Sequence, residues 1–482
     1  MRRLALCAFA VSALSATVAV AQRAPRDIVV RGLDAIGGEV AARGLAGMTQ
    51  EFYLINFGVG QSETPASPPR ASVTTGRIVT DWRGWRRFVT QEVRGPGGQL
   101  TTARSVLVGS AGAAGLPGRQ TPLSAIGVAA QHRAMRTTPH RLLLAALDPA
   151  ARLEALASRE YRGLMHDGVR VTTAEDTVTL YFDRASGMLA VGETETDDPI
   201  LGVRVTQTWF TRWQDTGGRV LFPRQVDTFV NGQLAGQLIT TATTAEPPAD
   251  SQFAMPDSIA SRPAASPAPI TVRLVELAPG VWRAEGGTHH SLVVEQADQL
   301  VLVEAPQSTL RVRAVLDTLR ARFPAKRVGI AVMTHHHWDH SGGIREVIAE
   351  GIPVATHEIN AAFVRQVAAA RRALAPDLQA QRRRSPALRT FADSMVIGSG
   401  EGRVVLYRQP TVHVEGLLSA WVPAAGVLFT ADVLAGGAAA LAPVGSAEMA
   451  ALARSRGLAP RWFAGAHGTV VPWADVERAA AR

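Results

Sequence analysis

Residues 334–343 read THHHWDHSGG and hold four of the 12 histidines of the chain. They directly follow the apolar run Val328–Met333, which predicts a buried strand, and the two glycines at their end let the chain turn into a helix. Along an extended segment alternate side chains point to the same side, so His335, His337 and Asp339 are expected to face one pocket. Imidazole nitrogens and carboxylate oxygens suit Zn²⁺, which binds them at about 2.0–2.2 Å. The stretch therefore predicts a metal site at the end of a strand.

The spacing His-x-His-x-Asp-His, completed by His340, resembles the signature of the metallo-β-lactamase-fold superfamily of hydrolases. The resemblance covers nearly all of residues 270–482, because further residues of the family pattern follow in order, each beside or at the end of an apolar strand: His413, Asp432 and His467. It implies a first metal ion bound by His335, His337 and His413, and a second bound by Asp339, His340 and His467. The carboxylate of Asp432 would lie between them.

Two positions depart from the family pattern. Glu304 follows the second strand where the family usually has Asp, so a supporting carboxylate remains but is one methylene longer. Ala431 precedes Asp432 where the family usually has Gly, which should leave the ligand intact.

The other histidines divide into three groups. His336 is expected to point away from its neighbours and to support the ligands rather than bind metal. The roles of His289, His290 and His357 stay open, although the family often places the segment of the first two near the pocket rim. Ordinary packing or surface positions are expected for His132, His140 and His166.

A segment rich in proline, alanine and serine, SIASRPAASPAPI at residues 258–270, has the composition of a linker. It separates a predicted N-terminal domain, residues 22–257, from a C-terminal domain, residues 270–482, with 258–269 as the linker. Alternating apolar and polar residues predict a mostly antiparallel sheet with a few helices in the first domain. Residues 141–159 are expected to form one or two helices, and Asp167-Gly168 and Asn231-Gly232 are expected to be hairpin turns. Alternating strand-like and helical segments in the second predict mixed sheets covered by helices. The expected fold class is α+β, with the αββα sandwich implied by the resemblance at the C-terminal end.

The N-terminal domain resembles the curved-sheet domains of periplasmic lipoprotein carriers (the LolA/LppX-like group). The resemblance is carried by widely spaced residues, among them residues 33–38 (LDAIGG), 180–183 (LYFD) and 221–223 (LFP). It implies a concave sheet able to hold an apolar ligand. The alternative is a packing domain that only shapes or shields the catalytic half.

The first 21 residues are expected to be a secretory signal, with Arg2 and Arg3 before an apolar run and Ala19-Val20-Ala21 before the cut. We therefore expect an exported, periplasmic protein with no stable membrane insertion. The only cysteine, Cys7, lies in that signal, so the mature chain would have no thiol for a nucleophile, ligand or disulfide. The net charge of +9 is mostly scattered arginine, which favours a solvated surface over nucleic-acid binding.

The family resemblance implies a zinc-dependent hydrolase, with two Zn²⁺ per chain, that attacks a small-molecule substrate through a hydroxide bridging the metals. Asp339 would orient this nucleophile and carry a proton. An ester-like bond, such as that of a lactone, is preferred over a β-lactam, because β-lactamases of this fold use a cysteine ligand or generally lack the bridging carboxylate. Three alternatives stay open: a β-lactamase, an iron-dependent oxygenase on the same fold, and an apolar-ligand-binding protein with a secondary metal domain. Iron and manganese stay open as the native metal.

Overall fold

A computed structural model describes residues 23–95, 98–116, 118–217, 219–262, 264, 269–437 and 441–482. The predicted signal peptide and Cys7 lie outside these residues. None of the helices in the part of the chain described here is long and apolar enough to cross a membrane.

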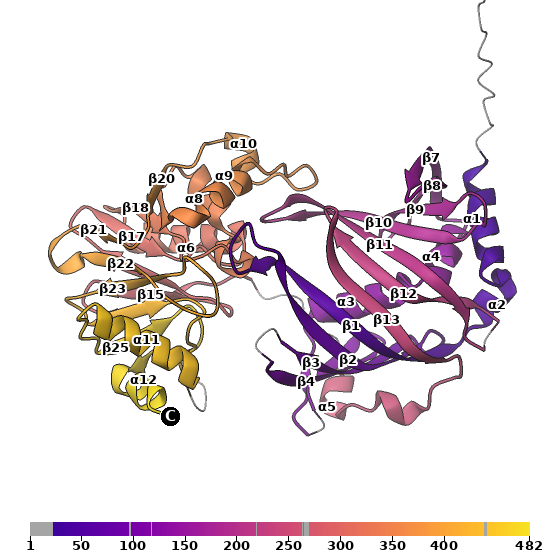
Figure 1. Ribbon diagram of the computed structural model, residues 1–482, viewed down its shortest axis with the longest axis horizontal. Helices are drawn as coiled ribbons and strands as arrows, with labels where there is room; N and C mark the ends of the chain where they lie inside the picture. Colours follow the sequence, from indigo (N-terminus) through magenta and orange to yellow (C-terminus); the bar gives the residue numbers. More distant parts are fainter. Residues whose placement is uncertain are drawn as a thin grey trace, which may run out of the picture.

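The N-terminal part is built on one large sheet of 13 strands (Figure 1). Its strands are β1 (Gly47–Ser62), β2 (Pro69–Asp81), β3 (Arg86–Arg94), β4 (Leu100–Val108), β5 (Ala111–Ala114), β6 (Thr121–Pro122), β7 (Arg152–Tyr161), β8 (Leu164–Thr172), β9 (Thr177–Asp183), β10 (Leu189–Asp198), β11 (Gly202–Asp215), β12 (Leu221–Val230) and β13 (Gln233–Thr244). Neighbouring strands are antiparallel, and the order runs from β6 down to β1, then from β13 down to β7. The predicted antiparallel β domain is therefore present.

Four helices pack against one face of this sheet: α1 (Pro25–Ala35), α2 (Gly38–Gly44), α3 (Ala125–Arg136) and α4 (Pro139–Ala146). Their apolar side chains form a core with Leu180 and Phe182 of β9 and with Phe210 of β11. Helices α1 and α2 are separate because Gly37 has a φ of +120°, and a Cβ there would collide with the carbonyl oxygen of Arg219. These helices and the strands that they contact thus form the main apolar core of the N-terminal domain.

Two local predictions in this part are wrong. Residues 141–159 were expected to be helical, but α4 ends at Ala146 and β7 begins at Arg152. Pairing with β8 and an alternating burial pattern override the helix-forming alanines and leucines there. Asp167-Gly168 was expected to be a hairpin turn but lies inside β8, and the turn falls at Arg162-Gly163, both with positive φ. The predicted turn at Asn231-Gly232 is confirmed, with φ of 47° and 82°.

The C-terminal part is a sandwich of two sheets. The first sheet has the strand order β14 (Arg273–Ala278), β15 (Val281–Glu285), β16 (Ser291–Glu295), β17 (Gln299–Val303), β18 (Arg327–Val332), β19 (Val354–His357) and β20 (Leu388–Phe391). The second has the order β21 (Ser394–Ile397), β22 (Val404–Arg408), β23 (Leu418–Val422), β24 (Val427–Thr430), β25 (Trp462–Gly465) and β26 (Val471–Pro472).

Helices cover the outer face of each sheet. The first sheet is covered by α6 (Thr309–Arg322), α8 (Ile344–Ala349) and α9 (Ala361–Ala369), and the second by α11 (Pro443–Ser455) and α12 (Trp473–Ala480). Two short helices, α7 (Trp338–Ser341) and α10 (Leu378–Arg382), lie in connections. Strand β17 is apolar on both sides for this reason: Val301 and Val303 face the other sheet, while Leu300 and Leu302 face the helices. The predicted α+β class and the αββα layers are confirmed.

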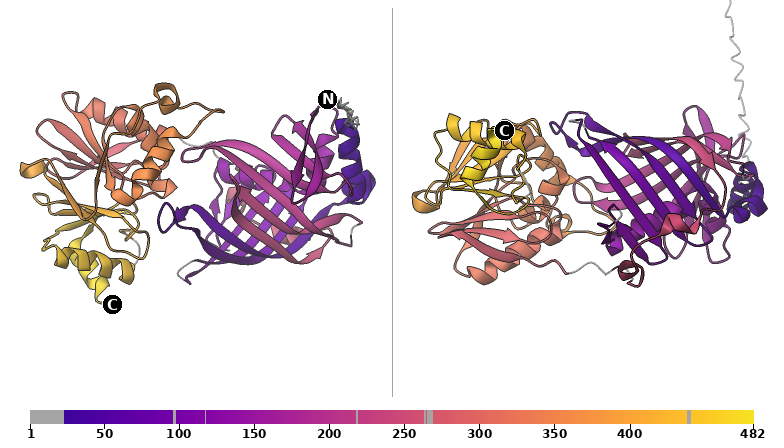
Figure 2. Two further views of the ribbon diagram at one scale, coloured as in Figure 1. Left: turned by 45° about the horizontal axis from the view of Figure 1, so that its top comes forward. Right: turned by 90° about the horizontal axis from the view of Figure 1, so that it is seen from below.

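The predicted linker is partly structured. Its beginning belongs to a helical turn, α5 (Asp257–Ala260), in which Ile259 is buried, and a short 3₁₀ helix (Asp250–Phe253) precedes it. The two parts also touch away from the linker: Ile200, between β10 and β11, packs into the core around α6 and α8. The hairpin of β1 and β2 extends toward the C-terminal part in each view (Figures 1 and 2).

Candidate metal centre

The candidate site lies at one edge of the sandwich, where several strands end. Strand β18 runs into the segment that carries His335, His337, Asp339 and His340. Strands β24 and β25 are parallel neighbours, so Asp432, just after β24, and His467, just after β25, lie at the same edge. Rigid strand ends and the loops that follow them hold the side chains in place.

One cluster joins His335, His337, His413 and Asp432, whose nearest ligand-type atoms all lie within 4.8 Å of one another. Nε2 of His413 lies 3.0 Å from Nδ1 of His337 and 3.2 Å from Oδ2 of Asp432. Nε2 of His335 lies 3.7 Å from the same oxygen. These are the residues that the resemblance assigns to the first metal, together with the carboxylate expected between the two.

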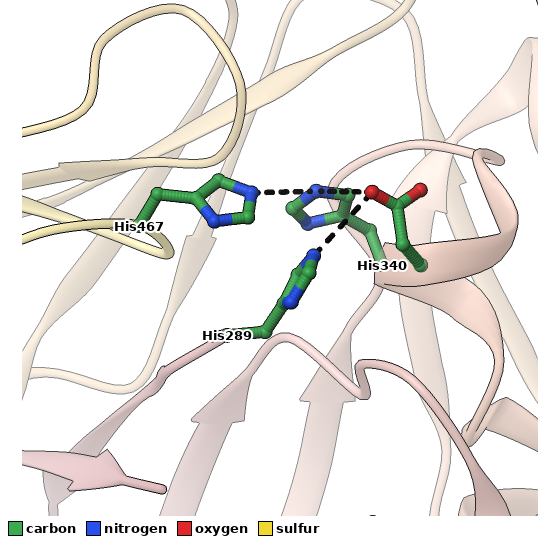
Figure 3. Close-up of side chains that lie close together, drawn as sticks. His289, His340 and His467 are labelled. Carbon is green, nitrogen blue, oxygen red and sulfur yellow. Dashed lines mark hydrogen bonds and ion pairs between the residues drawn. The ribbon is translucent and has the colours of Figure 1, made fainter. Parts of the chain in front are cut away.

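A second cluster joins Asp339, His340, His467 and also His289, again with ligand-type atoms within 4.8 Å of one another. The rings of the three histidines turn toward one another (Figure 3). Nε2 of His467 lies 3.4 Å from Nε2 of His340. Oδ2 of Asp339 lies 3.4 Å from Nε2 of His289 and 3.6 Å from Nε2 of His340.

Asp432 spans the two clusters. Its Oδ1 lies 2.9 Å from Nε2 of both His340 and His467, and its Oδ2 faces His413 and His335. Burial raises the pKa of this carboxyl group, but hydrogen bonds from His340, His413 and His467 outweigh burial and hold the pKa far below its usual range. Asp432 is therefore an ionised carboxylate with one oxygen for each cluster.

The donor set fits two divalent cations. Nε2 of His335 is fully buried and has no hydrogen-bond partner among the described residues, which leaves a lone pair or an N–H unsatisfied at a cost of about 1–3 kcal/mol. Burial and the neighbouring His340 lower the pKa of His335, so the ring is neutral, as a ligand must be. The two clusters can thus each hold a metal ion through nitrogen and oxygen donors.

A family comparison matches residues 284–461 to the metallo-beta-lactamase superfamily. These residues belong to that superfamily. No curated protein sequence matches the chain significantly.

Similar solved structures align with less than half of the chain. A metallo-beta-lactamase from Pontibacter korlensis is 18% identical, covering 44% of this chain and 98% of its own, with a TM-score of 0.34. The metallo-beta-lactamase FIM-1 from Pseudomonas aeruginosa, in a mono-zinc form, is 17% identical, covering 45% of this chain and 96% of its own, with a TM-score of 0.35. The family match does not extend to the N-terminal domain, so its resemblance to lipoprotein carriers stays a prediction.

Inside the metallo-beta-lactamase domain, Glu304 supports the second cluster. Its Oε2 lies 2.6 Å from Nδ1 of His340, and its Oε1 accepts a hydrogen bond from the hydroxyl of Thr334. Burial lowers the pKa of His340, but the carboxylates of Glu304 and Asp432 together outweigh burial and raise the pKa to about 10. Because Nδ1 donates to Glu304, Nε2 is the nitrogen that faces Asp432 and the metal position. Glu304, whose side chain is one methylene longer than the Asp of the family pattern, therefore makes the supporting contact with His340.

The structure places His289, but not its neighbour His290, in a cluster of ligand-type side chains. His289 lies on the loop between β15 and β16 and joins the second cluster, although the sequence shows only an isolated His-His pair there. The ring of His290 belongs to neither cluster, and its backbone N–H donates to the carbonyl of Ala466. His357 bonds to the carbonyl of Ala392 through Nε2.

The remaining histidines lie outside both clusters. Nε2 of His336 lies 3.3 Å from the hydroxyl of Ser62, and its ring packs against Phe363. The other three, as expected, make packing or backbone contacts in the N-terminal domain: His132, His140 and His166.

Proposed function

We propose that this chain is an exported, zinc-dependent hydrolase that cleaves an ester-like bond, with a lactone as the preferred substrate class. The observation that carries the proposal is the position of Asp432, with one carboxylate oxygen directed at each histidine cluster. A shared carboxylate is suited to holding two ions a few ångströms apart, the arrangement of two-metal hydrolases.

His335, His337 and His413 would hold one ion, and Asp339, His340 and His467 the other, with His289 beside the second. Bound there, the ions supply Lewis acidity that lowers the pKa of water and polarises the scissile bond. Asp339 is the residue suited to orient the attacking water. Burial raises its pKa, but hydrogen bonds from His289 and Gln61 and the charge of His340 outweigh burial and lower the pKa to about 2. Its carboxylate is therefore ionised at neutral pH and can accept a hydrogen bond from the attacking water and orient it.

The substrate preference rests on the ligand types. Cys7 is the only cysteine and lies in the segment that we expect to be removed as a signal, so the mature chain would have no cysteine ligand to offer the site. The bridging position of Asp432 favours the wider group of esterases, thioesterases and phosphodiesterases over β-lactamases. Export disfavours a glutathione thioester, which leaves a lactone or another ester.

The test is a substrate panel on the zinc-loaded full chain. Lactones and simple esters are compared with nitrocefin, a chromogenic β-lactam, for the parent and for His337→Ala and Asp339→Asn. We expect ester or lactone turnover in the parent, its loss in both variants, and retention in the control His132→Ala, which changes a histidine outside both clusters. Rapid nitrocefin cleavage would overturn the substrate assignment, and full activity in both site variants would overturn the mechanism.

Export is tested separately. The residues that support it are Arg2 and Arg3, the apolar run after them and Ala19-Val20-Ala21. Expression with the native N-terminus in a Gram-negative host should yield a periplasmic protein whose first residue is Gln22. An uncleaved chain in the cytoplasm would contradict it.

A further inference from the structure

The β1–β2 hairpin of the N-terminal domain is irregular where it meets the metal centre. Regular pairing runs to Phe57 opposite Ala71, and the next pair is Ser62 opposite Pro69. Residues 58–61 therefore face the single residue Arg70, so the chain bulges outward. Gly60, with a φ of +78°, permits the bulge.

The carbonyl oxygen of Ser62, at the end of this bulge, lies 2.9 Å from Nε2 of His337. A carbonyl oxygen only accepts hydrogen bonds, so Nε2 of His337 carries the hydrogen. Nδ1 then keeps its lone pair, and Nδ1 is the atom that faces Nε2 of His413 at 3.0 Å. The hairpin thus selects the tautomer in which Nδ1 is the metal ligand.

Gln61 contacts a second ligand residue. Its Nε2 donates a hydrogen bond of 2.8 Å to Oδ1 of Asp339. The other oxygen, Oδ2, is the one that faces His289 and His340. Gln61 therefore fixes the rotation of the carboxylate, so that Oδ2 points into the second cluster.

The hairpin is held in this position by independent contacts. The carbonyl of Glu63 accepts a hydrogen bond of 2.9 Å from the backbone N–H of Glu415, and Arg70 donates one of 3.1 Å to the carbonyl of Val412. Both partners flank His413. The hydroxyl of Ser62 donates to the carbonyl of Thr64 at 2.7 Å, which closes the tip on itself.

We propose that the hairpin tip, residues 58–64, is a positioning element of the metal centre, supplied by the N-terminal domain to ligands of the metallo-beta-lactamase domain. Ser62 sets the ligating nitrogen of His337, and Gln61 orients Asp339. The N-terminal domain is then a part of the metal site and not only a cover. This inference rests on the proposed two-metal function and adds to it the residues that organise the ligands.

The first test compares Gln61→Ala with the matched control Gln50→Ala in the full chain. Gln50 lies on the same strand, β1, outside the tip, and its Nε2 donates a hydrogen bond of 3.3 Å to the hydroxyl of Thr240 on β13. Cobalt(II) affinity is measured by competition with a chelator, and the absorption spectrum of the bound cobalt is recorded. We expect Gln61→Ala to weaken the binding of one of the two ions by about tenfold or more and to alter the spectrum. Gln50→Ala should change neither the affinity nor the spectrum.

The second test addresses the Ser62 carbonyl. Deletion of residues 59–61 restores regular pairing, keeps Ser62 opposite Pro69, and withdraws the tip from the site. We expect this variant, with its melting transition intact, to lose affinity for both ions. If the deletion does not fold, the comparison of Gln61→Ala with Gln50→Ala decides alone.

The outcomes separate the two proposals. Parental affinity and spectrum in Gln61→Ala, or in a folded deletion variant, would overturn the positioning role while leaving the hydrolase proposal in place. A parent chain that binds no cobalt would overturn both.

Discussion

Nδ1 of His340 donates a hydrogen bond to Oε2 of Glu304 at 2.6 Å, and neither side chain is exposed to solvent. Glu304 has a backbone φ of +83°, which is uncommon for a residue other than glycine. The extra methylene of Glu relative to the Asp of the family pattern is thus accommodated together with an unusual backbone conformation.

This contact makes Glu304 testable by two substitutions. Glu304→Gln keeps the length and an acceptor but removes the charge, so we expect metal affinity to fall by about 10–100-fold. Glu304→Asp keeps the charge but shortens the reach, so we expect a similar or larger loss. Chelator competition on the purified variants measures both. Parental affinity in both variants would show that the contact with His340 does not support the ligand.

Substitutions of Asp432 and His467 should differ in the number of metal ions whose binding they weaken. Asp432 faces both clusters, so Asp432→Asn should weaken the binding of both ions. The affinity for each ion should fall by more than about 100-fold, because a charged ligand is lost. His467 belongs to the second cluster only, so His467→Ala should weaken the binding of one ion. Metal titration followed by elemental analysis counts the ions retained. Loss of a single ion in Asp432→Asn would contradict the bridging position.

Metal affinity should rise with pH. In the metal-free chain the pKa of His340 is raised to about 10, so its Nε2 is protonated at neutral pH and a metal must displace that proton. Displacement of one proton increases apparent affinity by up to about tenfold per pH unit between about pH 7 and 9, and the rise levels off above the pKa. Chelator competition across this range measures the slope. In Glu304→Gln the slope should flatten, because the pKa of His340 falls without the carboxylate. A pH-independent parental affinity would contradict the prediction.

A buried ion pair should stabilise the fold near the domain contact. Arg345 is 1% exposed and binds both oxygens of Asp377, at 2.6 and 2.9 Å, while also donating to the carbonyls of Val367 and Ala370. Asp377→Ala leaves the guanidinium buried without its carboxylate, so we expect a loss of about 3–5 kcal/mol in the free energy of unfolding. Denaturant unfolding measures it, with Asp317→Ala, an exposed partner of Arg320, as the control. Equal stability of the two variants would contradict the prediction.

The C-terminal fold was predictable because its central strands and its metal-ligand motif carry clear signals, whereas the sequence did not predict strands such as β14, β20 and β21. Strands such as β17 and β18 are short, continuously apolar and followed by ligand-type residues, so the motif and its structural context agree. The order of His413, Asp432 and His467 completed the prediction of the two clusters. The weaker signals lay in the N-terminal domain, where β7 has leucines and alanines of helical preference and becomes a strand through its pairing with β8.

His289, Gln61 and Ser62 could not be assigned from the sequence for a different reason. His289 lies 50 residues from Asp339, and Gln61 lies 278 residues from it, so their contacts depend on how distant segments pack. The tip residues around Gly60 have the composition of any surface turn. Moreover, Ser62 acts through a backbone carbonyl, which every residue possesses, so no side-chain pattern can reveal it.

Metal content is the sharpest test of a two-metal site in the metallo-beta-lactamase domain. The purified full chain, saturated with zinc and freed of excess, should retain about two zinc ions per chain by elemental analysis, in line with the two clusters. His335→Ala and His467→Ala should each retain about one. A parent chain that retains one ion or none, or that excludes zinc in favour of iron, would rule out a two-zinc site.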